Sequence, residues 1–126
     1  MLELLTLPSP HIVGVRVSGK INHTDIENIL VELNSKLLDE SYLGIFIELE
    51  HFEGFTVRGL LREMKFLHKY RNRFTRTAVV GESRWFRRGS QLITRIFPNI
   101  DIEHFTHLQR DEALIWVSER DAGAFD

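Results

Sequence analysis

The chain has 126 residues, 43% of them hydrophobic, which is the size of a single globular domain with one core. It contains no cysteine, and this excludes disulfides, thiolate metal sites and a cysteine nucleophile. The formal net charge is only -2, and no run approaches the roughly 20 apolar residues of a membrane span. Residues 1–7 lack the basic start and the apolar length of a signal peptide. We therefore expect a cytoplasmic protein, peripheral at the inner face of the membrane where it meets one.

The first third of the chain predicts two strands and a helix. Leucines within residues 2–5 indicate a short strand or arm. Isoleucine and valine within residues 12–17 indicate a stronger strand, which we expect to end at Gly19. A helix is predicted over residues 25–38, because its apolar residues recur on one helical face. Thr24 stands three residues before a glutamate, the spacing of a capping box at the helix start.

The middle of the chain predicts a strand, a turn and a basic helix. Residues 43–50 alternate in the way that places side chains on two faces of a strand. Glu53 and Gly54 indicate a turn, and a second, amphipathic helix is expected from about Val57. Four cations of that helix recur at a spacing that forms one stripe. They are Arg58, Arg62, Lys65 and Lys69.

The last part of the chain predicts strand, helix, strand and helix. Residues 77–81 indicate a buried strand, and a third helix is expected from Arg84 until Pro98 ends it. A last strand is expected around residues 100–105. A final helix is expected over about 109–120, with acidic residues in its first turn, where the helix dipole favours anions. The last six residues are expected to be frayed.

Strands and helices alternate along this order, which favours parallel strand pairing with helices packed on the sheet. The sequence thus predicts a single α/β domain over residues 1–126. Its sheet would be mixed, mostly parallel and five-stranded, with about four helices.

Several phrases spread over nearly the whole chain resemble one family. They are VSGKI at residues 17–21, FEGF at 52–55, MKF at 64–66 with His68, and RTAVVG at 76–81 with Trp85. On these phrases the chain resembles the SpoIIAA-like family, relatives of the STAS domains that act as anti-sigma factor antagonists and as modules on anion transporters. The resemblance implies a mixed sheet with helices, in a fold group similar to the lipid-holding CRAL-TRIO domains. It also implies a bacterial-type regulator without enzymatic activity.

One departure from the STAS pattern concerns regulation. When the strand at residues 45–50 and Gly59 are laid on that pattern, the regulatory phosphoserine position falls on Val57. Valine has no hydroxyl, so the usual phosphorylation switch is not expected here. Thr56 is adjacent, but a shift of one residue at a helix start turns the side chain to a different side. Whether Thr56 is ever phosphorylated stays open.

Positive charge is concentrated in one part of the sequence. Residues 58–95 carry 11 Lys and Arg against two Glu, a net charge of +9, and the remaining residues carry -11. Either this is an ordinary solvated surface, or it is a binding surface for an anionic membrane or an acidic, lipid-like ligand. Aromatic residues beside the cations favour binding, near the carboxyl ends of the strands. The candidate contacts are Phe52, Phe55, Arg58, Arg62, Lys65, Phe86, Arg87, Arg88, Leu92 and Ile93.

Two other functions stay open. A regulatory protein-interaction module would present the start of the second helix to its partner, and a second copy of the chain is a further candidate partner. An enzyme would use Glu50, His51 and Glu53 for acid–base chemistry. Nucleic acid is not expected, because the aromatic residues do not alternate as on a stacking strand. We expect no cofactor and no metal, because His104 and His107 read as a strand end and not as one helical face.

Overall fold

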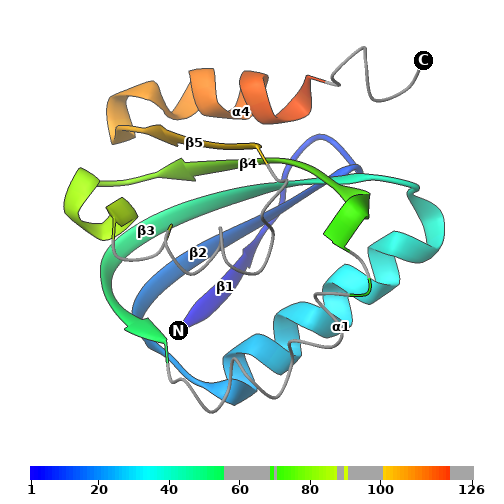
Figure 1. The fold of residues 1–126 in the computed structure, drawn as a ribbon, viewed down its shortest axis with the longest axis horizontal. Helices are drawn as coiled ribbons and strands as arrows, with labels where there is room; N and C mark the ends of the chain where they lie inside the picture. The colour runs from blue at the N-terminus through cyan, green and yellow to red at the C-terminus, as the bar shows by residue number, and fades with distance from the viewer. Residues whose placement is uncertain (56–68, 70, 88–89, 91–100, 120–126) are drawn as a thin grey trace.

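One sheet organises the molecule (Figure 1). The computed structural model describes residues 1–55, 69, 71–87, 90 and 101–119. The strands are β1 (Leu2–Leu5), β2 (Ile12–Ile21), β3 (Leu43–Phe55), β4 (Phe74–Val80) and β5 (Asp101–Phe105). They lie in the order β1-β2-β3-β4-β5, where β1 is antiparallel to β2 and every other neighbouring pair is parallel. The predicted fold class, an α/β domain with a mixed, mostly parallel, five-stranded sheet, is therefore confirmed.

Helices cover both faces of this sheet. Helix α1 (His23–Asp39) lies against one face, and helix α4 (Arg110–Ser118) lies against the other (Figure 1). Residues 83–87 are helical, as predicted for the start of the third helix. The predicted second helix, from Val57, lies outside the described residues. Within the described part of the chain, no helix has the length and apolar character needed to cross a membrane.

Helix α1 begins two residues earlier than the sequence indicated. Its N-cap is Asn22, whose side chain accepts a hydrogen bond from the Asp25 amide at 3.0 Å. The Asp25 carboxylate accepts one from the Asn22 amide at 3.1 Å, which completes the capping box. The expectation of a cap at Thr24 was wrong, because an asparagine with an aspartate three residues later satisfies the same orphan amides.

The other end of α1 is capped from a distant part of the chain. The Arg73 guanidinium donates hydrogen bonds to the carbonyl oxygens of Leu37 at 2.7 Å, Glu40 at 2.8 Å and Ser41 at 3.0 Å. The last carbonyls of a helix have no partner within it, so a cation there satisfies them and complements the helix dipole. Arg73 directly precedes β4, so this contact fixes the end of α1 to the start of that strand.

The buried apolar side chains form two clusters, one on each face of the sheet. The α1-side cluster consists of Val13, Val15, Val17, Ile21, Ile26, Leu30, Leu33, Leu37, Leu43, Leu49, Phe52, Phe74 and Val79. The α4-side cluster consists of Ile12, Phe46, Ala78, Val80, Phe105, Ala113 and Val117. Alternate residues of β3 and β4 enter opposite clusters, as the two-residue period of a strand requires.

Strands β2 and β3 run further than predicted because their pairing contains bulges. Ser18 pairs with Glu50 and Gly19 pairs with Phe52, so His51 is an extra residue on β3. The pairing then continues to Phe55, the last residue of β3. The expected strand end at Gly19 and the expected turn at Glu53 and Gly54 were therefore wrong. A bulge disrupts the alternation of side chains, and this disruption imitates a strand end in the sequence.

The C-terminal elements follow the predicted order with a different start to the helix. A single turn of 3₁₀ helix, η2 (His107–Gln109), precedes α4, and the Thr106 amide donates to the Gln109 side-chain oxygen there at 3.1 Å. Helix α4 then buries Ala113 and Val117 against the sheet. Trp116 is half-buried, with its ring 5.8 Å from that of Phe105.

Candidate functional site

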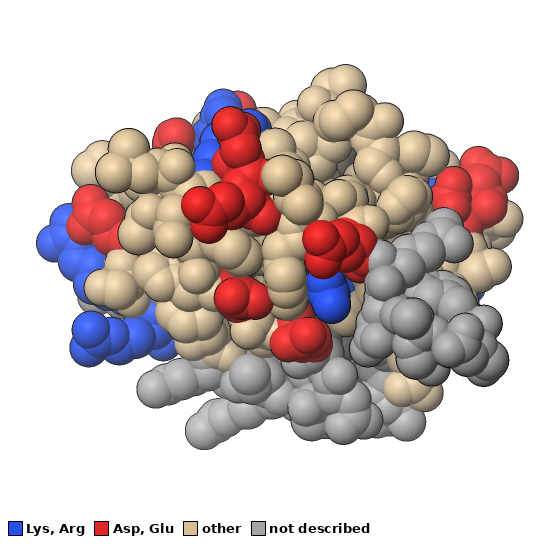
Figure 2. Space-filling model, turned by 90° about the horizontal axis from the view of Figure 1, so that it is seen from above, with Lys and Arg blue, Asp and Glu red and all other residues tan. Residues whose placement is uncertain are grey.

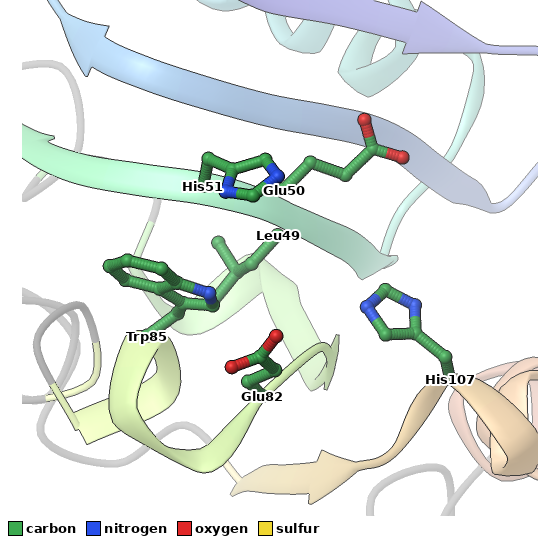
Figure 3. A pocket seen from close by; sticks show the side chains of 6 residues that line it. All are labelled: Leu49, Glu50, His51, Glu82, Trp85 and His107. Carbon is green, nitrogen blue, oxygen red and sulfur yellow. The ribbon is translucent and has the colours of Figure 1, made fainter.

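A polar pocket lies at the carboxyl edge of the sheet, between β3, the segment after β4, and η2 (Figure 3). Its volume is about 310 Å³. The lining residues are Leu49, Glu50, His51, Glu82, Trp85 and His107. Ligands of open α/β sheets bind at this edge, outside the carboxyl ends of the strands. This is the edge at which the sequence predicted ligand binding, but the residues predicted to contact a lipid-like ligand are not among those that line the pocket.

The bulge in β3 supplies one wall of the pocket. Leu49 and Phe52 both belong to the α1-side cluster although they are three residues apart, so the strand must place one extra residue between them. His51 is that residue, with a positive φ of 47°. A left-handed conformation is strained for a residue with a Cβ, and such residues concentrate at functional sites. The ring of His51 is exposed and lies edge-on to the Trp85 ring, with 6.4 Å between centroids.

The second wall is fixed by the turn that follows β4. A Cβ on Gly81 would lie 3.0 Å from the Cβ of Leu49, which is tighter than an ordinary contact, so a glycine here favours the close approach of the two segments. The Gly81 amide donates to the Phe105 carbonyl at 3.0 Å, and the His104 ring nitrogen Nε2 donates to the Gly81 carbonyl at 2.6 Å. Phe86 stacks on His104, with 4.7 Å between ring centroids. These contacts with β5 hold the short helix at residues 83–87 beside the pocket.

Arg84 contacts two residues of this wall. The Arg84 Nε atom is 2.9 Å from the Glu82 carboxylate, and the Arg84 guanidinium lies 4.4 Å from the centre of the Trp85 ring. Both members of this ion pair are largely exposed, Arg84 at 66% and Glu82 at 56% of the side chain. The carboxylate and the indole face thus form a surface that already holds a guanidinium.

A buried charge supports the pocket from the opposite face of the sheet. Glu48 is 6% exposed, and its carboxylate is bound by Arg16 from β2 and by Arg110 from the start of α4. Arg16 Nε also lies 3.5 Å from the carboxylate of Glu50. Because Arg110 begins α4 directly after η2, its ion pair ties the segment that carries His107 to the strand that carries His51.

The same network favours the charged form of Arg16. The hydrogen bond from Arg16 to Glu48 raises the pKa of the guanidinium above its ordinary value, and the charge of Glu48 adds to this effect. A basic group whose pKa is raised on folding stabilises the protein at every pH below its ordinary pKa. Since an arginine is protonated throughout the neutral range in any case, this stabilisation does not vary with pH there.

The residues predicted to bind a membrane or lipid are placed only in part. Phe52 is 1% exposed within the α1-side cluster, and its predicted role as an apolar contact for a lipid-like ligand stays a prediction. Phe86 is half-buried against His104, and Arg87 is exposed. For Phe55 only the backbone is described. The other candidates lie outside the described residues; they are Arg58, Arg62, Lys65, Arg88, Leu92 and Ile93.

The described cations of the basic segment are largely engaged. Arg73 caps α1, Arg84 pairs with Glu82, and Arg76 donates to the Trp116 carbonyl at 2.9 Å, with the Glu119 carboxylate at 3.5 Å. Figure 2 shows Asp and Glu side chains spread over the face that carries α4. The charge asymmetry of the sequence is thus partly balanced by ion pairs in the folded chain.

The pocket combines residues that the sequence treated separately. Glu50 and His51 were proposed as part of a catalytic trio with Glu53, but Glu53 is not among the lining residues. The participation of Glu82, Trp85 and His107 was missed. The rule that ligands bind outside strand carboxyl ends could have found them, since each follows the end of β4 or β5 by a few residues.

Solved structures share this architecture. An uncharacterised protein of the DUF3478 family with a SpoIIAA-like fold, from Shewanella loihica PV-4, matches with a TM-score of 0.69 and 18% identity, covering 93% of this chain and 92% of its own. The anti-sigma factor antagonist SpoIIAA in its unphosphorylated form matches with a TM-score of 0.56 and 16% identity, over 91% and 98% of the two chains. The Bacillus cell fate determinant SpoIIAA in its phosphorylated form matches with a TM-score of 0.55 and 16% identity, over 90% and 99%. At these identities the likeness shows the fold alone.

The class defined by this fold is that of SpoIIAA-like α/β domains. The profile of the SpoIIAA-like family matches residues 12–118, and the chain belongs to that family. The resemblance seen in the sequence is therefore confirmed. No curated protein matches the sequence.

Proposed function

We propose that the chain is a regulatory protein-interaction module, and that its partner binds at the pocket at the carboxyl edge of the sheet. The fold shared with an anti-sigma factor antagonist supports a module of this kind. The observation that carries the proposal is the pocket itself, where three chain segments bring a half-buried Trp85 together with Glu82, His51 and His107.

Trp85 has the properties of an interface anchor. Tryptophan is enriched among the residues that dominate binding energy, because it offers a large apolar surface together with one hydrogen-bond donor. Its ring is neither fully buried nor fully exposed, and it stands beside polar groups that can form the rim of a contact. The strained backbone of His51, beside Trp85, further supports a binding role for this site, since the fold maintains a conformation that costs about 1–3 kcal/mol.

The same module would be regulated differently from SpoIIAA. The structures of that protein exist in unphosphorylated and phosphorylated forms. Here Val57 stands at the expected phosphoserine position, so we propose that partner binding is not controlled by a phosphate at that residue. Thr56 and Val57 lie directly after Phe55, the last residue of β3.

Affinity capture with pocket variants tests this function. We expect the wild-type chain to retain a stoichiometric protein partner that is lost with Trp85→Ala and with Glu82→Lys. The matched control is Glu112→Lys, which changes the same charge at an exposed position of α4. Retention of the partner by both pocket variants at the wild-type level would show that the pocket is not the binding surface.

Peripheral membrane association stays a prediction. Of its described members, Arg87 is exposed and Phe86 is half-buried. Co-sedimentation with vesicles tests it, because binding through the basic segment must be stronger to anionic than to neutral lipid. Equal binding to both kinds of vesicle, or binding to neither, would remove the membrane hypothesis.

A further inference from the structure

The wall of the pocket formed by Glu82 and Trp85 holds a guanidinium in the free chain. Arg84 contacts the carboxylate at 2.9 Å and lies 4.4 Å from the centre of the indole ring. A carboxylate that accepts hydrogen bonds together with an aromatic face that stacks is the combination that suits a planar guanidinium. The contact of Arg84 thus shows that Glu82 and Trp85 together suit a guanidinium group.

The remaining charges around the pocket agree with a cationic ligand. Glu82 points into the space that the rings of His51, Trp85 and His107 surround, whereas Glu50 points away from it (Figure 3). Glu50 faces Arg16, at 3.5 Å, on the opposite face of the sheet. A carboxylate attracts a cationic ligand and repels an anionic one. Arg84 belongs to the same short helix as Trp85 and contacts two of the lining residues, Glu82 and Trp85, without lining the pocket itself.

Arg84 is held in a way that lets another guanidinium replace it. Its ion pair with Glu82 is exposed on both sides, and exposed pairs contribute little to stability because water and salt compete for both charges. Its side chain is long and reaches solvent, so it can turn away without disturbing the core. The indole, in contrast, is fixed by its helix and by the edge-on contact with His51.

We infer that Glu82 and Trp85, at the rim of the pocket, bind an arginine side chain of the protein partner, which replaces Arg84 there. This inference rests on the proposed function and adds the chemistry of the partner to it. In the free chain, Arg84 covers Glu82 and Trp85, and binding of the partner would displace it. Arg84 then competes with the partner for one site.

A pair of tripeptides isolates this chemistry. N-acetyl-Gly-Arg-Gly-amide and its citrulline counterpart differ in one atom and in charge, because citrulline is the neutral isostere of arginine. We would titrate each into the ¹⁵N-labelled full chain and follow the indole N–H signal of Trp85. The chain has two tryptophans, so Trp116→Phe assigns that signal. We expect the arginine tripeptide to shift it saturably and to bind about threefold more tightly than the citrulline tripeptide, the difference that an exposed ion pair makes.

Two substitutions test the exchange with Arg84. Glu82→Gln should weaken binding of the arginine tripeptide about threefold, because an exposed ion pair is lost. Arg84→Ala should strengthen it severalfold, because the internal competitor is removed. Glu112→Gln, at the exposed position on α4, should leave it unchanged. Equal affinity for the two tripeptides, no loss with Glu82→Gln, or weaker binding with Arg84→Ala would each overturn the inference.

The outcomes separate this inference from the proposed function. If the partner is lost with Trp85→Ala while the two tripeptides bind equally, the module binds its partner through other chemistry, and only the inference is wrong. If the arginine tripeptide binds selectively while a captured partner is retained by Trp85→Ala and Glu82→Lys, the arginine is not the partner's. In that case the pocket takes a small guanidinium ligand, and both proposals are wrong.

Discussion

The two faces of the sheet are stabilised by different physical means. The face under α1 is covered by a helix of 17 residues that buries Ile26, Leu30, Leu33 and Leu37 in one apolar cluster. The face under α4 is covered by a helix of nine residues, and a buried carboxylate, Glu48, lies on this face beside Phe46. A long helix can be held by apolar burial alone. A short one gains less from burial, and here an ion-pair network fixes its start.

This difference assigns separate roles to the two faces. Among the described residues, the α1-side cluster contains more of the buried apolar side chains, and it also provides the base of the pocket through Leu49. The α4 side positions η2, and with it His107, through the contact of Arg110 with Glu48. We therefore expect substitutions under α1 to change global stability, and substitutions in the Glu48 network to act mainly on α4 and the pocket.

The largest effect should come from the α1-side cluster. Phe52→Ala removes a side chain that is 1% exposed, and we expect the free energy of unfolding to fall by about 3–5 kcal/mol because a cavity is left in the core. Urea denaturation measures this loss. Phe52→Leu is the control and should cost about 1 kcal/mol. A loss below about 1 kcal/mol for Phe52→Ala would contradict the placement of this ring in the main core.

The second largest effect should come from the Glu48 network and should differ between the two faces of the sheet. Glu48→Gln removes the negative charge between Arg16 and Arg110, and we expect a loss of about 2 kcal/mol, at the low end for a buried pair because both arginines are partly exposed. Hydrogen exchange should show faster exchange of α4 amides with little change in α1.

A matched substitution checks that burial of the charge is responsible. Glu50→Gln removes the other carboxylate beside Arg16, but its side chain is 50% exposed, so we expect less than about 0.5 kcal/mol. Equal losses for the two glutamates, or equal changes in α1 and α4, would show that the network does not act selectively on α4.

A third effect has the opposite sign. His51→Gly relieves the left-handed conformation of a residue with φ of 47°, and we expect the stability to rise by about 0.5–1 kcal/mol. The same change removes the ring that contacts Trp85, so binding of the partner should weaken. Thermal unfolding and the capture experiment measure the two quantities on one variant. His51→Ala keeps the strain, so the stability of this variant should not rise. A lower stability of His51→Gly than of His51→Ala would contradict this account.

The smallest effect should be at the α4 end of the pocket. Leu108 in η2 is 99% exposed, so Leu108→Ser should change the free energy of unfolding by less than about 0.5 kcal/mol. A larger destabilisation, measured by urea denaturation, would mean that this leucine packs against another part of the chain.

The sequence predicted best those features that depend on a regular spacing of residues or a regular order of elements. Apolar spacing predicted α1, and the alternation of elements predicted the mostly parallel sheet, because both depend on local repeats that burial enforces. The length of β3 was missed, since the extra residue His51 breaks the period that defines a strand. The helix cap was misplaced by two residues, because Asn22 and Thr24 both start a capping-box pattern and only packing decides between them.

The candidate site was harder to predict than the fold. Glu82, Trp85 and His107 are separated along the chain, and their meeting depends on where β4 and β5 end in the folded sheet. The network of Glu48 with Arg16 and Arg110 links residues up to 62 positions apart, for which no local pattern exists. Clusters of like charge are visible in a sequence, but the ion pairs that neutralise Arg76 and Arg84 are not.

The parallel register of β2, β3 and β4 has a consequence for how the chain folds. Val13 pairs with Ile45 and Ile45 pairs with Thr77, so each partner lies 32 residues further along the chain. Such a topology has a high contact order, and only the β1–β2 hairpin can form from neighbouring residues. On a ribosome, most of the sheet must therefore wait until later strands have been synthesised. During this delay the apolar strands are exposed, and assistance by chaperones would act at that stage.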